Sequence, residues 1–310
     1  MFFLMNQTGK LTQCASVPQN QKFICALGCF DGVHKGHRSL IETVVSCEDG
    51  LIPAVWTFSE PLSFPFIETV ETRVKLCAAL GVRFAFCEEF SQLKKMSPAE
   101  FVDRLAGFNI AHIVCGQDFR FGNKREGDIN ILREECAKRG IALTVKEPVT
   151  TEIAGETVQV SSTLIRKLIR EGELEKANEL LCRPFTLKGV VINGNKIGRT
   201  ISVPTVNQSL PECRVAPRFG VYDSVFCIDG RKYPAVTNVG TRPTVNKNEN
   251  NITCETHIIH ENLDLYGMVV EVEFHRYNRP EQKFSDLDDL KAQIARDIEH
   301  SVEYFSDINK

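Results

Sequence analysis

The chain has 310 residues, of which 43% are hydrophobic and 25% are charged, and its formal net charge is −3 at pH 7. This length predicts two domains or one large one, and this composition is typical of a protein that buries a full core, which argues against extensive disorder. The small negative charge argues against general nucleic-acid binding through a basic surface, although a local basic pocket for a nucleotide is compatible with it.

The first residues and the cysteines indicate the cellular compartment. Residues 1–5 are apolar, but Asn6 and Gln7 end this run far short of a signal sequence or a membrane span. We expect a cytoplasmic protein that does not contact the membrane, and a loosely held segment from residue 1 to about 20, which lacks clear periodicity. The twelve cysteines include no Cys-x-x-Cys pair and mostly stand alone in apolar runs, so we interpret them as small buried hydrophobic residues that stay reduced.

From residue 22 onward, short apolar runs alternate with helical patterns. Expected strands are residues 23–27, 52–58, 82–87, 112–115 and 141–145. Expected helices are residues 39–47, 71–80, 98–106 and 129–138, and the third has Ser97 as a candidate N-cap with Glu100 three residues later. This alternation predicts a parallel sheet covered by helices, which binds ligands beyond the carboxyl ends of its strands.

A glycine-rich turn follows the first expected strand. Its sequence is Gly28-Cys29-Phe30-Asp31-Gly32-Val33-His34-Lys35-Gly36-His37. Gly32 and Gly36 allow the backbone to approach a ligand, and the helix that follows presents unpaired N–H groups to an anion. His34 and His37 face the same space, and imidazoles donate hydrogen bonds to a phosphoryl oxygen that gains charge. The turn therefore predicts a phosphate site, with a structural histidine pair or a stray metal site as the alternative.

Two later stretches also carry polar residues, one in a loop after an expected strand and one at the start of an expected helix. The first is the loop Cys115-Gly116-Gln117-Asp118-Phe119-Arg120-Phe121-Gly122, and the second is Val160-Ser161-Ser162-Thr163-Leu164-Ile165-Arg166 at the start of an expected helix. Taken alone, the loop is compatible with a structural role, and the serine and threonine with ordinary helix capping. Spare hydroxyls at a helix start also bind anions, and Arg166 can fork onto phosphate oxygens.

These three motifs, in this order, resemble those of the nucleotidylyltransferase superfamily, and the first is similar to the start of the bifunctional bacterial riboflavin kinase/FAD synthetases. The resemblance implies a Rossmann-like first domain that adenylylates FMN to FAD with ATP. His34, His37 and Arg166 would be the catalytic groups, acting by orientation and charge stabilisation because the phosphate of FMN is already an anionic nucleophile. The residues implied to contact nucleotide are Gly28, Phe30, Asp31, Gly36, Asp118, Ser162 and Thr163.

After a last helical pattern at residues 175–181, Pro184 ends the helical periodicity, and we expect domains at residues 1–185 and 186–310. Strand-like runs follow at residues 186–192, 220–228, 232–238, 253–260 and 269–275. Asp229-Gly230 is a hairpin signal between two of them. A terminal helix at residues 287–304 carries an apolar stripe of Leu290, Ile294 and Ile298. The pattern predicts a small antiparallel β-barrel with one C-terminal helix.

The second half resembles the riboflavin kinase module of the same family. Pro204-Thr205-Val206-Asn207 and the glycine loop before it match its Gly-Arg-x-x-Gly-x-Pro-Thr-Ala-Asn segment, and further matches surround Asn238, Glu255 and residues 279–284. The resemblance implies that Thr205 and Asn207 help to hold Mg²⁺ and that Glu255 is the catalytic acid–base residue, accepting the proton of the riboflavin hydroxyl. The residues implied to contact ATP or flavin are Gly194, Gly198, Arg199, Asn238 and Arg242.

Two single residues and one three-residue stretch depart from the family pattern. Ser202 replaces the usual glycine and Val206 the usual alanine, and Glu60-Pro61-Leu62 stands where the first domain usually has Pro-His-Pro.

The resulting prediction is an enzyme that converts riboflavin to FMN and FMN to FAD with ATP and Mg²⁺, as a monomer or weak homo-oligomer, with no nucleic-acid or membrane partner. The alternatives are a riboflavin kinase whose first domain is degenerate or transfers to another substrate, and a catalytically weak flavin- or nucleotide-binding regulator.

Overall fold

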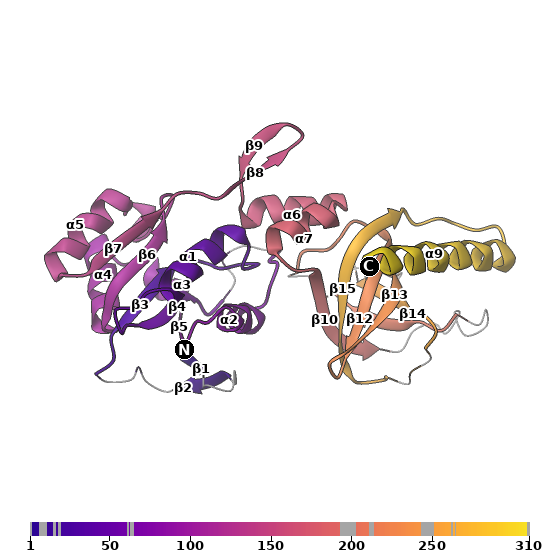
Figure 1. Ribbon diagram of the computed structural model, residues 1–310, viewed down its shortest axis with the longest axis horizontal. Helices are drawn as coiled ribbons and strands as arrows, with labels where there is room; N and C mark the ends of the chain where they lie inside the picture. The colour runs from indigo at the N-terminus through magenta and orange to yellow at the C-terminus, as the bar shows by residue number, and fades with distance from the viewer. Residues whose placement is uncertain are drawn as a thin grey trace. The chain divides into compact units, whose positions relative to one another are not determined.

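The computed structural model describes residues 2–5, 11–14, 17, 20–60, 62, 65–192, 203–210, 214–242, 251–261, 263 and 265–308. The chain divides into two compact units, Met1–Ser162 and Thr163–Lys310 (Figure 1). The expected domain boundary near residue 185 stays a prediction. Over the part of the chain that is described, no helix has the length and apolar character needed to cross a membrane.

A seven-stranded sheet with the order β2-β1-β5-β4-β3-β6-β7 forms the centre of the first unit. Its parallel strands are β3 (Phe23–Leu27), β4 (Ile52–Phe58), β5 (Phe84–Glu88), β6 (Ile110–Gly116) and β7 (Ala142–Lys146). They confirm the five strands expected from the apolar runs. From β3 the sheet extends through β4 and β5 on one side and through β6 and β7 on the other. The direction in which successive strands are added therefore reverses beside β3. The carboxyl ends of β3 and β6 therefore border the crevice where open parallel sheets bind ligands.

Helices cover both faces of this sheet. They are α1 (Lys35–Val45), α2 (Val70–Ala79), α3 (Phe90–Leu93), α4 (Pro98–Gly107) and α5 (Ile129–Arg139). Helices α1 and α2 bury residues such as Ile41 and Val74 against one face, and α4 and α5 bury residues such as Phe101 and Leu132 against the other. The hydrophobic effect of these two clusters holds the layers together and leaves the strand ends open to ligands.

Local hydrogen bonds decide where two of these helices begin. Ser97 and Glu100 form both halves of the expected capping box at the start of α4. The expected start of α1 at residue 39 is wrong, because α1 begins at Lys35 with His34 as its N-cap. The Nδ1 atom of His34 accepts the backbone N–H of His37 at 3.4 Å, a capping role that histidine seldom takes and that the pattern did not indicate.

The expectation of a loosely held N-terminal segment is wrong for β1 (Phe2–Met5) and β2 (Leu11–Cys14). Strand β1 pairs antiparallel with β2 and with β5, so that these two short strands extend the parallel sheet on the β5 side. The ring of Phe2 also packs against the rings of Phe84, Phe86 and Phe108. Partners far along the chain stabilise this segment, so its own residues carry little signal.

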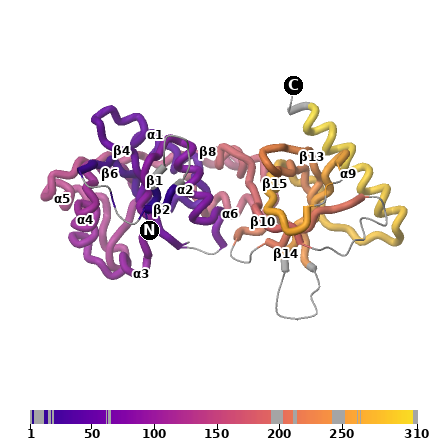
Figure 2. The backbone as a smooth tube through the Cα atoms, turned by 90° about the horizontal axis from the view of Figure 1, so that it is seen from below, coloured from indigo at the N-terminus to yellow at the C-terminus, as the bar shows by residue number. Residues whose placement is uncertain are grey.

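The second unit begins with α6 (Ser162–Glu171) and α7 (Leu174–Leu181) and continues as a closed barrel of order β10-β11-β14-β13-β12-β15. The strands are β10 (Phe185–Ile192), β11 (Val206–Ser209), β12 (Gly220–Ile228), β13 (Arg231–Arg242), β14 (Asn251–Ile258) and β15 (Val269–Arg279). All neighbours pair antiparallel, which confirms the expected barrel (Figure 2). Strand β11, which the run pattern did not predict, completes the closure.

Two expected features of the barrel are confirmed. Asp229 and Gly230 have φ values of 48° and 76° between the paired ends of β12 and β13, as a type I′ hairpin turn requires. The terminal helix α9 (Leu287–Ile308) lies against the barrel, and Ile298 of its apolar stripe packs on Val221 and Val236. A bidentate ion pair between Arg279 and Asp297 also attaches α9 to the end of β15.

Candidate functional site

The glycine turn after β3 is fixed by the side chain and carbonyl of Asp31. Its carboxylate accepts the backbone N–H groups of Ile67 and Glu68, each at 3.0 Å, and Asp31 is only 3% exposed. Its carbonyl oxygen accepts the hydroxyl of Ser162 at 2.8 Å. The turn is therefore preorganised, and Ser162 of the third motif reaches it.

The predicted histidine pair is brought together as a stacked pair. The rings of His34 and His37 have centroids 3.7 Å apart and an interplanar angle of 19°. A Cβ atom on Gly36 would lie 3.2 Å from Cε1 of His34, so the absent side chain makes room for the imidazole. Burial lowers the pKa of His37 well below its usual value, and the nearby His34 and Arg73 lower it further. His37 is therefore neutral at pH 7 and can donate a hydrogen bond without a full charge.

Gly28 and Phe30 lie beneath this pair. Phe30 is fully buried with a φ of 54°, and its ring centroid lies 5.1 Å from that of His37. A Cβ atom on Gly28 would come within 3.3 Å of the same ring. These two residues support the histidines from the core side of the turn.

The remaining residues of the third motif lie on the first turn of α6. Nη2 of Arg166 donates to Oγ1 of Thr163 at 3.2 Å. Both residues belong to the second compact unit, whereas Ser162 ends the first. A joint site of Thr163 and Arg166 with the histidines stays a prediction.

Asp118 lies on the loop after β6. A Cβ atom on Gly116 would lie 2.9 Å from Oδ1 of Asp118, so the glycine allows the carboxylate to fold back over the strand end. Oδ2 accepts Nε2 of Gln159 at 3.2 Å. Gln159 ends the hairpin of β8 (Thr150–Ile153) and β9 (Glu156–Gln159), which projects from the first unit in Figure 1. The loop and the hairpin are thus linked through the predicted nucleotide-contacting residue.

An aromatic cavity of about 350 Å³ lies at the ends of β4 and β6, and sequence reasoning missed it. Its apolar lining comes from Trp56, Phe58, Phe90, Leu93, Phe101, Phe119 and Phe121, with Lys94, Arg120, Lys124 and Arg125 also lining it. Phe119 and Phe121 stack with an interplanar angle of 16°. Glu60, one of the residues that depart from the family pattern, helps to hold a wall of this cavity, because its Oε1 accepts a hydrogen bond from the backbone N–H of Phe90 at 3.2 Å. The aromatic richness of the loop was visible in the sequence, but its closure with β4 and α3 was not.

Strand register aligns three predicted residues of the barrel. Glu255 on β14 is the cross-strand partner of Asn207 on β11 and of Asn238 on β13. Directly opposite residues of antiparallel strands lie on one face of a sheet with Cβ atoms about 4.5–5.5 Å apart. The neighbouring Thr237 and Thr256 are fully buried inside the barrel, so the aligned residues face outward. A carboxylate flanked by two amides therefore lies on the outer side of the barrel wall, with Glu255 and Asn238 half-buried and Asn207 buried.

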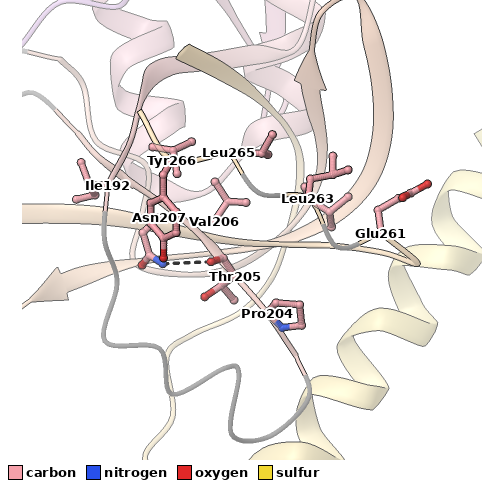
Figure 3. Close-up of a pocket in the computed structure, with 11 residues that line it drawn as sticks. Ile192, Pro204, Thr205, Val206, Asn207, Glu261, Leu263, Leu265 and Tyr266 are labelled. Atoms are coloured by element: carbon pink, nitrogen blue, oxygen red, sulfur yellow. Dashed lines mark hydrogen bonds between the residues drawn. The ribbon is translucent and has the colours of Figure 1, made fainter. Parts of the chain in front are cut away.

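Thr205 and Asn207 lie together in a small cavity of about 40 Å³ beside this row (Figure 3). Nδ2 of Asn207 donates to the carbonyl of Thr205 at 3.4 Å, and Tyr266 lines the same cavity. His257 fixes the segment from the other side, since Nδ1 lies 2.9 Å from the carbonyl of Pro204. The side-chain oxygens of Thr205 and Asn207 are neutral, hard donors that fit Mg²⁺ with phosphates and water as its other ligands.

The other predicted kinase residues are only partly described. Gly194, Gly198 and Arg199 lie outside the described residues, as does the variant Ser202. Arg242 ends β13, and only its backbone is described.

Glu281 is a candidate that sequence reasoning did not single out. Its Oε1 accepts a hydrogen bond from Nδ2 of Asn238 at 3.1 Å, and a Cβ atom on Gly240 would clash with that oxygen. The segment after β15 therefore reaches the row of Asn207, Glu255 and Asn238, and Gly240 makes this approach possible.

Comparisons with known proteins match each half of the chain to a family. The riboflavin kinase family model matches residues 181–305, and the FAD synthetase family model matches residues 16–164. The bifunctional riboflavin kinase/FMN adenylyltransferase of Bacillus subtilis is 31% identical over 94% of this chain and 95% of its own length. The enzyme of the same name from Pseudomonas fluorescens is 35% identical over 91% and 92% of the two chains.

A solved structure from Streptococcus pneumoniae, described as a macrolide-efflux protein, has a TM-score of 0.83 and 29% identity over 92% of this chain and 95% of that chain. Its description differs from the activities named for the curated relatives, which agree with both family models. The expected family is confirmed: this chain belongs to the bifunctional riboflavin kinase/FMN adenylyltransferases.

Proposed function

We propose that this chain makes FMN and FAD in two ATP-dependent steps, with riboflavin phosphorylated in the barrel and FMN adenylylated at the glycine turn. The observation that carries the proposal is the register that aligns Glu255 with Asn207 and Asn238, together with the cavity that Asn207 and Thr205 both line. It gives the barrel a base next to oxygen donors for a metal. The agreement with both family models favours two activities over a kinase with a degenerate first domain.

In the first step Glu255 accepts the proton of the primary hydroxyl of riboflavin as that oxygen bonds to the γ-phosphorus of ATP. The bond from the γ-phosphorus to the bridging oxygen breaks, and ADP leaves with the electron pair. Thr205 and Asn207 would hold Mg²⁺, which when bound neutralises phosphate charge. Asn238, held by Glu281, orients the hydroxyl toward Glu255.

In the second step a phosphate oxygen of FMN bonds to the α-phosphorus of ATP, and pyrophosphate leaves with the electrons of the broken bond. The nucleophile is an anion, so no base is needed. His34 and His37 act as hydrogen-bond donors to the oxygens that gain charge in the transition state, and Thr163 and Arg166 hold phosphate oxygens.

The aromatic cavity is the proposed site for the isoalloxazine ring of FMN. A flat aromatic ring fits stacked phenylalanines such as Phe119 and Phe121, and basic side chains such as Arg120 attract a phosphate. Asp118, on the same loop, contacts the nucleotide.

The proposed setting is a cytoplasmic monomer or weak homo-oligomer, with small-molecule partners and no nucleic acid, and with the domains divided near residue 185. Among the residues that the structure describes, eleven cysteines are free thiols, and six of these are buried, as suits a reducing compartment.

Two variants in one chain test the assignment. Glu255→Gln should reduce FMN formation from riboflavin by about 10²- to 10⁴-fold, and conversion of supplied FMN to FAD should continue. His37→Ala should lower the rate of FAD formation more than it weakens FMN or ATP binding, and His37→Asn should be milder because it keeps a donor. Flavin chromatography and calorimetric ATP titration supply the measurements. Equal loss of both activities in either folded variant contradicts the two-site proposal.

A further inference from the structure

Arg73 on α2 is a fully buried charged residue that the two proposed steps do not use. Nη1 donates to Oγ1 of Thr57 at 3.3 Å. Among the residues that the structure describes, its Nε and Nη2 atoms have no hydrogen-bond partner. A guanidinium group is a permanent cation, and burying it with so few partners is costly compared with an apolar side chain of similar volume. Its neighbours along the buried face of α2, such as Val74 and Cys77, are apolar, so packing alone does not require an arginine.

A chain of hydrogen bonds leads from Arg73 to the glycine turn. The hydroxyl of Thr57, at the carboxyl end of β4, donates to the carbonyl oxygen of Cys29 at 3.0 Å. Thr57 is 1% exposed, so this contact is protected from water. Arg73 therefore orients the hydroxyl that fixes the first part of the turn, between Gly28 and the histidines.

The charge of Arg73 also changes the pKa values of residues in the glycine turn. Burial raises the pKa of Cys29, and Arg73 opposes that rise. Burial is the largest cause that lowers the pKa of His37, and the charges of His34 and Arg73 lower it further. The guanidinium is thus a fully buried positive charge that acts on the glycine turn and its histidines from within the core.

We propose that Arg73 is a positioning residue for adenylyl transfer, which fixes the glycine turn through Thr57 and supplies a permanent positive charge beneath His37. This inference rests on the proposed function of the turn. The charge favours the anionic phosphoryl groups that gather above the turn, and the hydrogen bonds keep the donors of the turn in one geometry.

Arg73→Met tests the proposal, because methionine fills the core without a charge. We expect kcat for FAD formation to fall by about 10²-fold, with a smaller change in KM for FMN and ATP. The loss of the neighbouring cation lets His37 gain a proton more easily, so the acid limb of the rate-against-pH profile should move to higher pH. Arg73→Lys keeps the charge and should leave this limb in place. FMN formation in the same samples is the internal control and should stay at the wild-type rate.

His37→Ala tests the function of the glycine turn separately from the role of Arg73. If His37→Ala forms FAD at the wild-type rate, the proposed function of the turn fails. If His37→Ala is impaired while folded Arg73→Met keeps the wild-type kcat and pH profile, only the role of Arg73 is refuted.

If Arg73→Met does not fold, Thr57→Val replaces it as the test. This variant removes the hydroxyl at nearly constant side-chain volume. The proposal then requires a lower kcat for FAD formation in Thr57→Val, with an unmoved acid limb in Arg73→Lys. A wild-type rate in Thr57→Val, or a shifted acid limb in Arg73→Lys, overturns it.

Discussion

Replacing Gly127 with alanine tests whether the aromatic cavity holds the flavin ring of FMN. Gly127 pairs with Phe121 through two backbone hydrogen bonds, of 3.1 and 2.9 Å, which close the loop that lines the cavity. A Cβ atom on Gly127 would lie 2.7, 2.8 and 2.9 Å from three carbons of the Phe121 ring. The added methyl group therefore pushes directly on one wall of the cavity.

The size of the effect follows from these contacts. Ordinary carbon contacts begin near 3.5 Å, so the closest ring carbon must move by roughly 0.8 Å. Phe121 is 6% exposed and is packed against Phe101 and Phe119, with ring centroids 5.0 and 5.6 Å away. Overpacking of this kind costs about 1–3 kcal/mol. If the same free energy is lost from the binding of FMN in the cavity, KM for FMN in FAD formation should rise by roughly 5- to 150-fold.

Steady-state FAD formation with varied FMN measures this change, and FMN formation from riboflavin is the internal control. Gly107→Ala is the matched control variant, because Gly107 ends α4 with no atom within 4 Å of the added Cβ. It should leave both activities unchanged and stabilise the helix by at most about 1 kcal/mol. An unchanged KM for FMN in Gly127→Ala would remove the aromatic cavity as the flavin site.

Three further expectations concern the kinase loop, the barrel and the thiols. Ser202→Gly, at a position outside the described residues, should raise kcat/KM for ATP in FMN formation because glycine permits closer backbone approach; no change, or a fall, means that the chain is packed around the serine. Asp297→Ala should lower the free energy of unfolding by about 3–5 kcal/mol in urea titrations, since it leaves the largely buried Arg279 unpaired, and a loss below about 1 kcal/mol would contradict this. Alkylation followed by mass spectrometry should modify the exposed Cys182 at pH 8 and spare Cys77 until unfolding, because burial raises the pKa of Cys77 to about 12; equal modification of both would refute this.

The sequence alone determined the features that local chemistry specifies. Residues 23–27 form a buried run that becomes β3 with the same ends, and Asp229-Gly230 forms the expected hairpin turn. The capping box of Ser97 and Glu100 likewise needs only neighbours within one turn. Motif resemblance added the family, because each phosphate motif is a short contiguous stretch with its own backbone geometry.

Tertiary structure decided what depends on distant partners. The alignment of Asn207, Glu255 and Asn238 follows from barrel register, and a shift of one residue would turn each side chain to the opposite face. The role of Arg73 is equally non-local, because its helical pattern does not reveal that Thr57 and the glycine turn lie beside it. The two hydrogen bonds of Thr57 join residues 16 and 28 positions apart in the chain, and their energies arise only when the fold brings the segments together.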